Sequence, residues 1–453
     1  MTSKQTTIVA LLLGSLCADI SSAPTRSSGG WKQREFIITF WCAPPATDEA
    51  LARVAAEGYN LTWGPAEGLD VAARHHLRAM LTSDLLKPEV LDEPVKRAQL
   101  DAMIERVKKH PALEAYFLTD EPGAGAFPGL AKLVAYLRQR DPAHLAYINL
   151  YPTYANEQQL GVSAEATERA KVSYPTNFAG VGTDDKTVLR YREHVKRFVE
   201  TVKPDLISYD HYHFLKRNSD GSPNDGTQYF LNIALIRMAA REAHVPFLNI
   251  IQAGDEEKAW RVPNAEEMRW LVYTTLAYGG RGISYFTYWG IPGGLYVDGK
   301  PSPLVKPVAA LNAEIAKLGP ALLELESLAV YHTVPLPYGT EAIPASAPVQ
   351  LVGEGQLVLG LFGNSGRPSA FMIVNRDYEH SVDARLRIAL PGRQLQELDR
   401  NTGKWSRGEA LSRDRMVKIK LGPGDGRLCR VTGFPQDEEN QRGAYKLMKG
   451  VGL

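Results

Sequence analysis

The stretch LEAYFLTDEPGAGAFPGLAKLVAYLRQRDPAHLAYINLYP, residues 113–152, decides the fold class. It begins with an apolar, strand-like run that ends in charged residues. Residues 127–140 carry apolar side chains three and four positions apart, as a helix with one buried face does. Residues 145–152 return to a strand-like run. Two strands joined by a helix make a βαβ unit, in which the strands lie parallel in one sheet.

The same alternation extends from this unit in both directions along the chain. Strand-like runs lie at 35–45, 59–65, 77–84, 113–122, 145–152, 204–214, 246–255 and 281–290. Helical patterns lie at 48–58, 93–110, 127–140, 186–202, 228–243, 265–279 and 305–322. Eight strands alternating with helices over about 290 residues match a (β/α)8 barrel, for which about 250 residues are typical. A doubly wound open sheet is the alternative. It is disfavoured because the first strand is followed by CAPPAT (42–47) instead of the glycine-rich phosphate-binding turn of such sheets.

The pattern changes after residue 324. Short β-type runs such as QLVLGLF (356–362) and MVKIKL (416–421) are separated by turn signals such as GPGDG (422–426), with no helical period between them. We therefore predict an α/β chain in which a (β/α)8 TIM barrel at 35–324 is followed by a small C-terminal antiparallel β-sandwich at 325–435. The polar segment 436–453 is predicted to be a disordered tail.

The N-terminus has the pattern of an export signal. Lys4 precedes the apolar run IVALLLGSLCA (8–18), which is too short to cross a bilayer, and small residues follow it at 21–23. We expect a signal peptide at 1–23, a linker at 24–34 and a secreted or periplasmic protein without a membrane-spanning segment in the mature chain. A buried N-terminal strand is the alternative for the apolar run.

Composition narrows the class of partner. A net charge of +1 over 453 residues argues against nucleic acid or an anionic membrane as the main partner. Twenty Tyr and seven Trp suit a site that stacks sugar rings, although most such rings pack in cores. Cys42 and Cys429, which follow the signal, are too far apart for a disulfide scaffold and lack metal-ligand spacing. We predict no cofactor and no metal, and the oligomeric state stays open.

The working face of such a barrel lies at the C-terminal ends of its strands. Alternation along residues 204–214 places Asp210 and Tyr212 on one side and His211 and His213 on the other, where packed histidines are the alternative to ligands. Aromatic, amide and imidazole groups at these ends suit a neutral, polyhydroxylated ligand. The predicted substrate-binding residues are Trp41, Trp63, Asn149, Tyr151, His211, Tyr212, Gln252 and Trp289. For each Trp alone, core packing is an equal alternative.

Two adjacent carboxylates, Asp120 and Glu121, close the strand-like run at 113–122. A Glu beside an ionised Asp, partly desolvated at a barrel mouth, shifts toward its protonated form, as a general acid requires. The alternatives are that Asp120 caps the following helix or that Glu121 pairs with an arginine.

FLTDEPG (117–123) resembles the acid/base strand of the large clan of (β/α)8 glycoside hydrolases, in which a fourth-strand Glu, usually between Asn and Pro, is the acid/base. Glu121–Pro122 matches this pattern, and Asp120 replaces the Asn. The resemblance implies a nucleophilic Glu at the end of the seventh strand, where this chain has Gln252. Asp255 and Glu256 follow it and could substitute. Asp210 is the other candidate for the second carboxylate, with binding of a substrate hydroxyl or orientation of a histidine as the equal alternative.

The Asp-Glu pair is also similar to that of the substrate-assisted β-hexosaminidases. That resemblance implies Glu121 as the acid and Asp120 as the group that orients a 2-acetamido substituent, with Tyr212 available to bind the acetamido oxygen. The sequence thus predicts a glycoside hydrolase acting on an extracellular oligo- or polysaccharide, with Glu121 as general acid/base. A non-catalytic carbohydrate-binding barrel is the alternative from a different class.

Overall fold

A computed structural model describes residues 30–163, 178–182, 185–255, 259–291 and 293–433. The predicted signal peptide, most of the predicted linker, the predicted tail and Glu256 lie outside these residues. Within the described chain, no helix combines the length and the apolar character that a membrane span needs.

The N-terminal part is a barrel of eight parallel strands in the order β1-β8-β7-β6-β5-β4-β3-β2. The strands are β1 (Ile37–Phe40), β2 (Leu61–Gly64), β3 (Arg78–Leu81), β4 (Leu113–Asp120), β5 (Leu145–Leu150), β6 (Ile207–His211), β7 (Phe247–Gln252) and β8 (Gly282–Phe286). The barrel closes between β1 and β2, where the Asn60 N–H donates to the Ile38 carbonyl at 3.1 Å. The predicted (β/α)8 barrel is confirmed.

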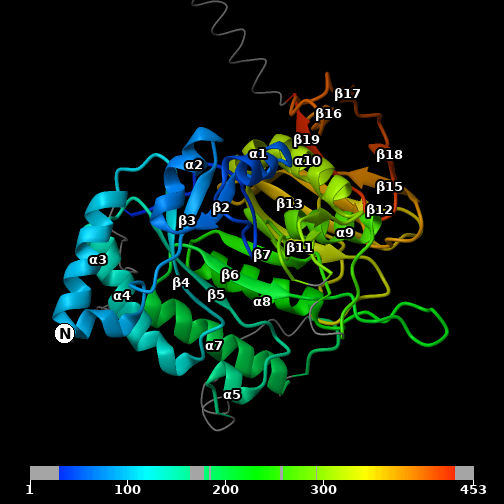
Figure 1. The fold of residues 1–453 in the computed structure, drawn as a ribbon. Coiled ribbons are helices and arrows are strands. Elements are labelled where there is room, and N and C mark those ends of the chain that lie inside the picture. The colour runs from blue at the N-terminus through cyan, green and yellow to red at the C-terminus, as the bar shows by residue number, and fades with distance from the viewer. Residues whose placement is uncertain (1–29, 164–177, 183–184, 256–258, 292, 434–453) are drawn as a thin grey trace, which may run out of the picture.

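Helices connect the strands on the outside of the barrel, as Figure 1 shows. They are α1 (Asp48–Ala56), α2 (Leu69–Arg74), α3 (Pro94–Val107), α4 (Phe127–Arg140), α5 (Glu157–Leu160), α7 (Lys186–Val202), α8 (Tyr229–Glu242), α9 (Ala265–Ala277) and α10 (Val305–Glu324). Their starts follow from local side chains. Asn264 and Glu267, for example, form a reciprocal capping box at the start of α9. A short hairpin of β9 (Tyr296–Val297) and β10 (Lys300–Pro301) lies between β8 and α10.

The C-terminal part is an antiparallel β-sandwich of two sheets, which confirms the predicted class. The six-stranded sheet has the order β11-β13-β14-β19-β16-β17 and the three-stranded sheet has the order β12-β15-β18. The strands are β11 (Glu326–His332), β12 (Val349–Leu351), β13 (Leu357–Asn364), β14 (Arg367–Asn375), β15 (Val382–Ile388), β16 (Gln394–Glu397), β17 (Glu409–Ala410), β18 (Met416–Leu421) and β19 (Gly426–Thr432). Inward side chains such as Leu359, Phe371 and Leu386 form a core between the sheets.

The barrel and the sandwich share a second core. Alternate residues of β13 and β14, such as Val358 and Met372, belong to the same buried cluster as the barrel. The indole N–H of Trp270 on α9 donates to the Arg376 carbonyl at 2.9 Å. At Gly360 a Cβ would lie 2.2 Å from the Ala277 carbonyl oxygen, so the backbones of β13 and α9 meet without a side chain between them. The sandwich is therefore packed directly on one helix of the barrel.

Candidate active site

Two carboxylates and one amide converge at the C-terminal ends of β4, β5 and β6. The sheet register pairs Asp120 with Asn149 and Asn149 with Ser208, so the neighbouring Asp210 ends beside them. The Asn149 amide nitrogen donates to Asp120 at 3.0 Å and to Asp210 at 2.9 Å. Ser208 donates to the Asn149 amide oxygen at 3.0 Å and so fixes which end of the amide faces the carboxylates.

Glu121 joins this group because, after burial, its negative charge and then a hydrogen bond between the two side chains raise the pKa of Asp210. Two carboxyl groups can bond in this way only when one of them carries a proton. The backbone of Glu121 has φ of +44°, and its N–H donates to the Asn149 carbonyl at 2.9 Å. A positive φ is uncommon outside glycine, costs about 1–3 kcal/mol and is concentrated at functional sites.

Burial favours the protonated forms of the two aspartates. Asp210 is 4% exposed, and its burial, followed by the negative charge of Glu121, raises its pKa well above the ordinary value. The hydrogen bond from Asn149 opposes this rise. The pKa of Asp120 is also raised, mainly by the protein that surrounds it, although its side chain reaches solvent. Burial and the charge of Glu121 therefore favour the protonated form of Asp210.

Aromatic rings border the carboxylates on the β1–β5 side. Trp41 and Trp63 have ring centroids 4.9 Å apart, and Phe117 lies 5.1 Å from Trp63. Tyr147 lies 5.8 Å from Trp63, and its hydroxyl is 2.7 Å from Ser208. The rings are thus connected through Ser208 to the amide that holds the carboxylates.

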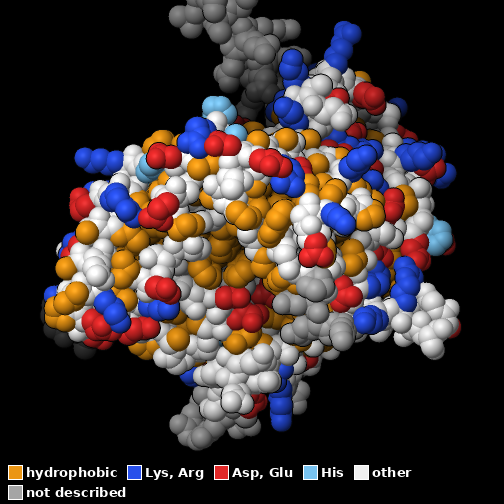
Figure 2. Space-filling model, viewed as in Figure 1, with side chains coloured by type: hydrophobic (Ala, Val, Ile, Leu, Met, Phe, Trp, Pro, Cys, Tyr) orange, Lys and Arg blue, Asp and Glu red, His pale blue; other side chains and the backbone are white. Residues whose placement is uncertain are grey.

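A second aromatic group lies on the β6–β8 side. Tyr212, which follows β6, has its ring 4.4 Å from Trp260 and 5.1 Å from Phe286. The pKa of Tyr151, which follows β5, is raised by burial and then by the negative charges of Glu121 and the two aspartates. Figure 2 shows a hollow on this face, lined by hydrophobic side chains, with acidic side chains gathered at its lower edge, near the β5 and β6 labels of Figure 1. This arrangement presents flat apolar faces beside proton donors and acceptors.

Three predicted substrate-binding residues have their described contacts away from this group. Gln252 is 1% exposed. Its amide oxygen accepts from the Phe214 N–H, and its amide nitrogen donates to the Phe214 and Arg261 carbonyls. His211 is buried with its Nδ1 2.9 Å from Asn232 of α8, as its side of the strand indicates. Trp289 stacks on Tyr296 at 5.7 Å, under the Arg53 guanidinium.

Asp255 and Glu256, the other candidates for the second carboxylate, follow β7 in the chain. Asp255 is partly buried and lies against the Gly293 backbone, where a Cβ on the glycine would be 2.7 Å from the Asp255 nitrogen. Glu256 is outside the described residues. Of the candidates for the second carboxylate that the structure describes, Asp210 is therefore the one beside Glu121.

Several residues of the site were not anticipated from the sequence. Tyr147 and Ser208 lie two positions before Asn149 and Asp210 on the same strands, so period-two alternation could have found both. Phe117 and Phe286 are ordinary strand residues, and Trp260 lies in a loop, where no local pattern marks them. Among the described residues, no group of three or more His, Cys, Asp or Glu is placed to hold a metal ion.

No family model and no curated protein matches the chain. Solved structures match the chain at low identity. A glycoside hydrolase family 5 protein from Bacteroides vulgatus is 11% identical with a TM-score of 0.49, over 90% of this chain and 92% of that one. A family 51 α-L-arabinofuranosidase from Bifidobacterium longum is 11% identical with a TM-score of 0.41, over 86% and 92%. A putative α-L-fucosidase from Bacteroides thetaiotaomicron is 10% identical with a TM-score of 0.40, over 67% and 99%. The barrel itself is established by the parallel sheet described above.

Proposed function

We propose that the protein is a glycoside hydrolase whose catalytic pair is Glu121 and Asp210. The observation that carries this proposal is the gathering of these carboxyls around Asn149, at the end of the barrel where such enzymes work, with Glu121 close enough to raise the pKa of Asp210 and aromatic rings on two sides. Glycoside cleavage needs a proton for the leaving oxygen and a carboxylate for the oxocarbenium-like centre, and this pair holds one proton between two carboxyls.

The shared proton gives the pair a direct route to both roles. Glu121 receives the proton from Asp210 along their hydrogen bond and donates it to the glycosidic oxygen as that bond breaks. Asp210, left as a carboxylate that Asn149 hydrogen-bonds, forms a bond to the anomeric carbon as the leaving group departs. In the second half-reaction water attacks the anomeric carbon and gives a proton to Glu121, while the bond to Asp210 breaks and its carboxylate is released, so that the pair again holds one proton.

The closeness of the pair favours retention of configuration. Carboxyl groups are about 5–5.5 Å apart in retaining enzymes and about 6.5–9.5 Å apart in inverting ones, which leave space for a water molecule. A hydrogen-bonded pair is nearer to the first arrangement. This favours a retaining, two-carboxylate mechanism over the substrate-assisted one, in which Asp120 alone would stand beside Glu121.

The test is a hydrolysis screen with aryl glycosides and oligosaccharides, including 2-acetamido sugars. With the best substrate, Glu121→Gln should lower kcat about 10²- to 10⁴-fold and leave oligosaccharide binding within threefold of the wild type. Glu67→Gln is the matched control, because Glu67 is exposed and, within the described chain, its ion-pair partner is Arg106 at the surface. A wild type that binds sugars without cleaving any, or a Glu121→Gln variant with full turnover, would refute the proposal. Cleavage confined to 2-acetamido sugars would favour the substrate-assisted mechanism.

We also propose that the enzyme acts outside the cytoplasm, on an extracellular oligo- or polysaccharide. The support is the apolar run at 8–18 and the small residues at 21–23. Mass spectrometry of the protein recovered from an expressing cell should find a mature N-terminus close to residue 24. An intact Met1 on the accumulated protein would contradict export.

A further inference from the structure

The segment that carries Trp260 is held by backbone pairing with the chain that follows β6. Trp260 and Leu215 form an antiparallel bridge, with the Lys216 N–H donating to the Ala259 carbonyl at 2.9 Å and the Arg261 N–H donating to the Phe214 carbonyl at 3.1 Å. We call residues 259–261 the Trp260 segment. Because the ring of Trp260 packs on Tyr212 beside Asp210, the position of this segment sets one wall of the candidate site.

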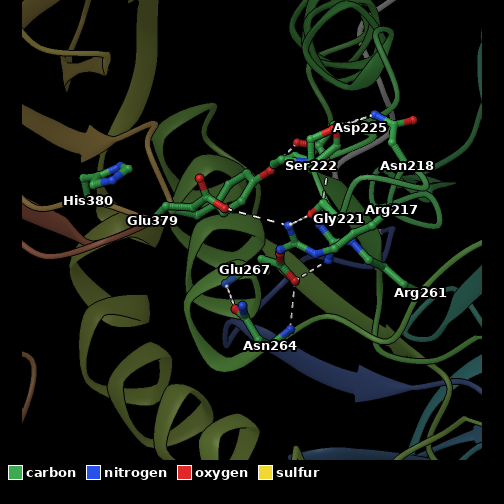
Figure 3. Close-up of polar contacts among 12 residues, drawn as sticks. Arg217, Asn218, Gly221, Ser222, Asp225, Arg261, Asn264, Glu267, Glu379 and His380 are labelled. Carbon is green, nitrogen blue, oxygen red and sulfur yellow. Dashed lines mark hydrogen bonds and ion pairs between the residues drawn. The ribbon is translucent and has the colours of Figure 1, made fainter.

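Side chains fix the far end of this pairing, as Figure 3 shows. The Arg261 guanidinium pairs with Glu267 at the start of α9 and lies 3.5 Å from Asp225. It also lies 4.6 Å from the centroid of the Phe214 ring. Arg261 therefore joins the Trp260 segment to the loop between β6 and α8, to which Asp225 belongs.

The sandwich reaches into this network through the loop between β14 and β15. The Tyr378 hydroxyl donates to Asp225, and the Tyr378 ring meets Phe214 edge-on at 5.5 Å. Glu379 lies 3.9 Å from Arg217, which also pairs with Glu267. Figure 3 shows the Glu379 carboxylate directed toward Arg217. Two neighbouring residues of the sandwich thus contact the loop between β6 and α8, which in turn pairs with the Trp260 segment.

The loop that carries these residues is itself rigidly held. The Asp377 carboxylate accepts the backbone N–H groups of Glu379 at 2.7 Å and His380 at 2.9 Å. Arg376 donates to the Pro335 carbonyl at 2.6 Å. Such a loop can transmit the position of the sandwich to its partners on the barrel.

Asp225 depends on this contact. In the part of the chain that the structure describes, its one hydrogen bond is the bond from Tyr378, while its other oxygen is buried without a hydrogen-bond partner. Arg261 Nη2 and Glu267 Oε1 likewise make no hydrogen bond among the described residues and are held by longer ion pairs, to Asp225 at 3.5 Å and to Arg217 at 3.7 Å. A network that combines a few hydrogen bonds with long ion pairs has few alternative bonds to hold it when one is lost.

We propose that Tyr378 and Glu379 of the sandwich are positioning residues that hold the Trp260 segment in place, so that the sandwich completes the sugar-binding wall of the barrel. This inference rests on the proposed function for its effect on substrate, but the contact itself is independent of any activity. It gives the C-terminal domain a part in substrate binding without contact between the sandwich and the substrate.

The test compares Tyr378→Phe with the wild type in two measurements. The variant keeps the ring against Phe214 and removes the hydroxyl. Hydrogen exchange at the Lys216 and Arg261 amides should accelerate about fivefold, and KM for an oligosaccharide should rise about fivefold with kcat changed less than twofold, since a lost hydrogen bond is worth about 1 kcal/mol. Glu379→Gln should act in the same direction more weakly, because its ion pair is partly exposed.

Tyr331→Phe is the control, since Tyr331 packs against the core of the sandwich, away from this network. It should change neither measurement. Unaltered hydrogen exchange in Tyr378→Phe, or an unaltered KM in an active enzyme, would overturn the inference. If the wild type proves inactive on every glycoside, the proposed function fails, and the hydrogen-exchange result alone decides whether the sandwich positions the Trp260 segment.

Discussion

Asn149 gives its two amide hydrogens to two different carboxylates, Asp120 and Asp210, while its amide oxygen accepts a hydrogen bond from Ser208. A side chain used in this way has no free donor for a substrate hydroxyl. We therefore assign Asn149 to holding the carboxylates, whereas the sequence alone predicts that it binds substrate. Its amide favours the ionised form of both aspartates, against the effect of burial.

Removing this amide should impair catalysis more than folding. We expect Asn149→Ala to lower kcat about 10- to 100-fold, because each carboxylate loses a donor worth about 1.5–3 kcal/mol to a charged group. The pH at which activity is half-maximal should shift as well. Asn249→Ala is the matched control, since Asn249 is a buried strand residue that bonds Thr275 far from the carboxylates. Equal kcat losses in the two variants, with no shift in the pH profile, would show a purely structural role.

Asp210 should make the stability of the protein depend on pH. Its pKa is higher in the folded state than in the unfolded state, so its contribution is complete below the unfolded pKa of about 4 and is lost as the pH rises toward the folded pKa. Asp210→Asn has no such proton to lose and can still accept from Asn149. We expect its Tm to exceed that of the wild type by an amount that grows from about pH 4 to about pH 8. A difference that is constant or shrinks over this range would contradict the assignment.

At the scale of single residues, the sequence identifies the carboxylates of the site but not the role of every polar residue at a strand end. Asp120, Glu121 and Asp210 could be found because each follows an apolar run whose end must reach the barrel mouth. Gln252 also ends such a run, yet its amide bonds the backbone of two loops. Which role a strand-end amide takes depends on contacts between segments far apart in the chain, and local pattern contains no information about them.

At the scale of elements, length decided what could be predicted. Long amphipathic helices such as α4 and α7 repeat their apolar spacing several times, and their bounds were predicted residue for residue. α2 has six residues and α5 has four, too few for the period to appear, and both were missed. β11 was missed because residues 326–332 continue directly from α10 without a turn signal.

The contact between β13 and α9 should tolerate no side chain at Gly360. We expect Gly360→Ala to lower the free energy of unfolding by about 1–3 kcal/mol, since the new methyl group would overlap the Ala277 carbonyl. Gly125→Ala is the control, because a Cβ there has open space around it. Its effect should stay within about 0.5 kcal/mol in denaturant titrations. Equal stability of the two variants would mean that β13 and α9 can separate at little cost.

At the scale of the whole molecule, barrel and sandwich should unfold as one unit. Val358, Phe362 and Met372 of the sandwich are buried in the same cluster as the barrel helices, so neither part keeps a complete core alone. We expect calorimetry to give a single transition whose calorimetric and van't Hoff enthalpies agree. Two resolved transitions would show that each part is stable by itself, and would also weaken the case for a sandwich that positions a barrel loop.

The bonds of Gln252 also limit how this site could evolve. One nucleotide change converts a glutamine codon to a glutamate codon, and it is the shortest mutational path to a carboxylate at the end of the seventh strand. Glutamate cannot donate to the Phe214 and Arg261 carbonyls, so its charge would face two oxygens that now accept from the amide. The same substitution would remove the hydrogen bonds that tie the loops after β6 and β7 to Gln252. Descendants of this chain are therefore more easily altered around Asp210 than given a nucleophile on the seventh strand, and an engineer who wants new chemistry here should begin on the sixth strand.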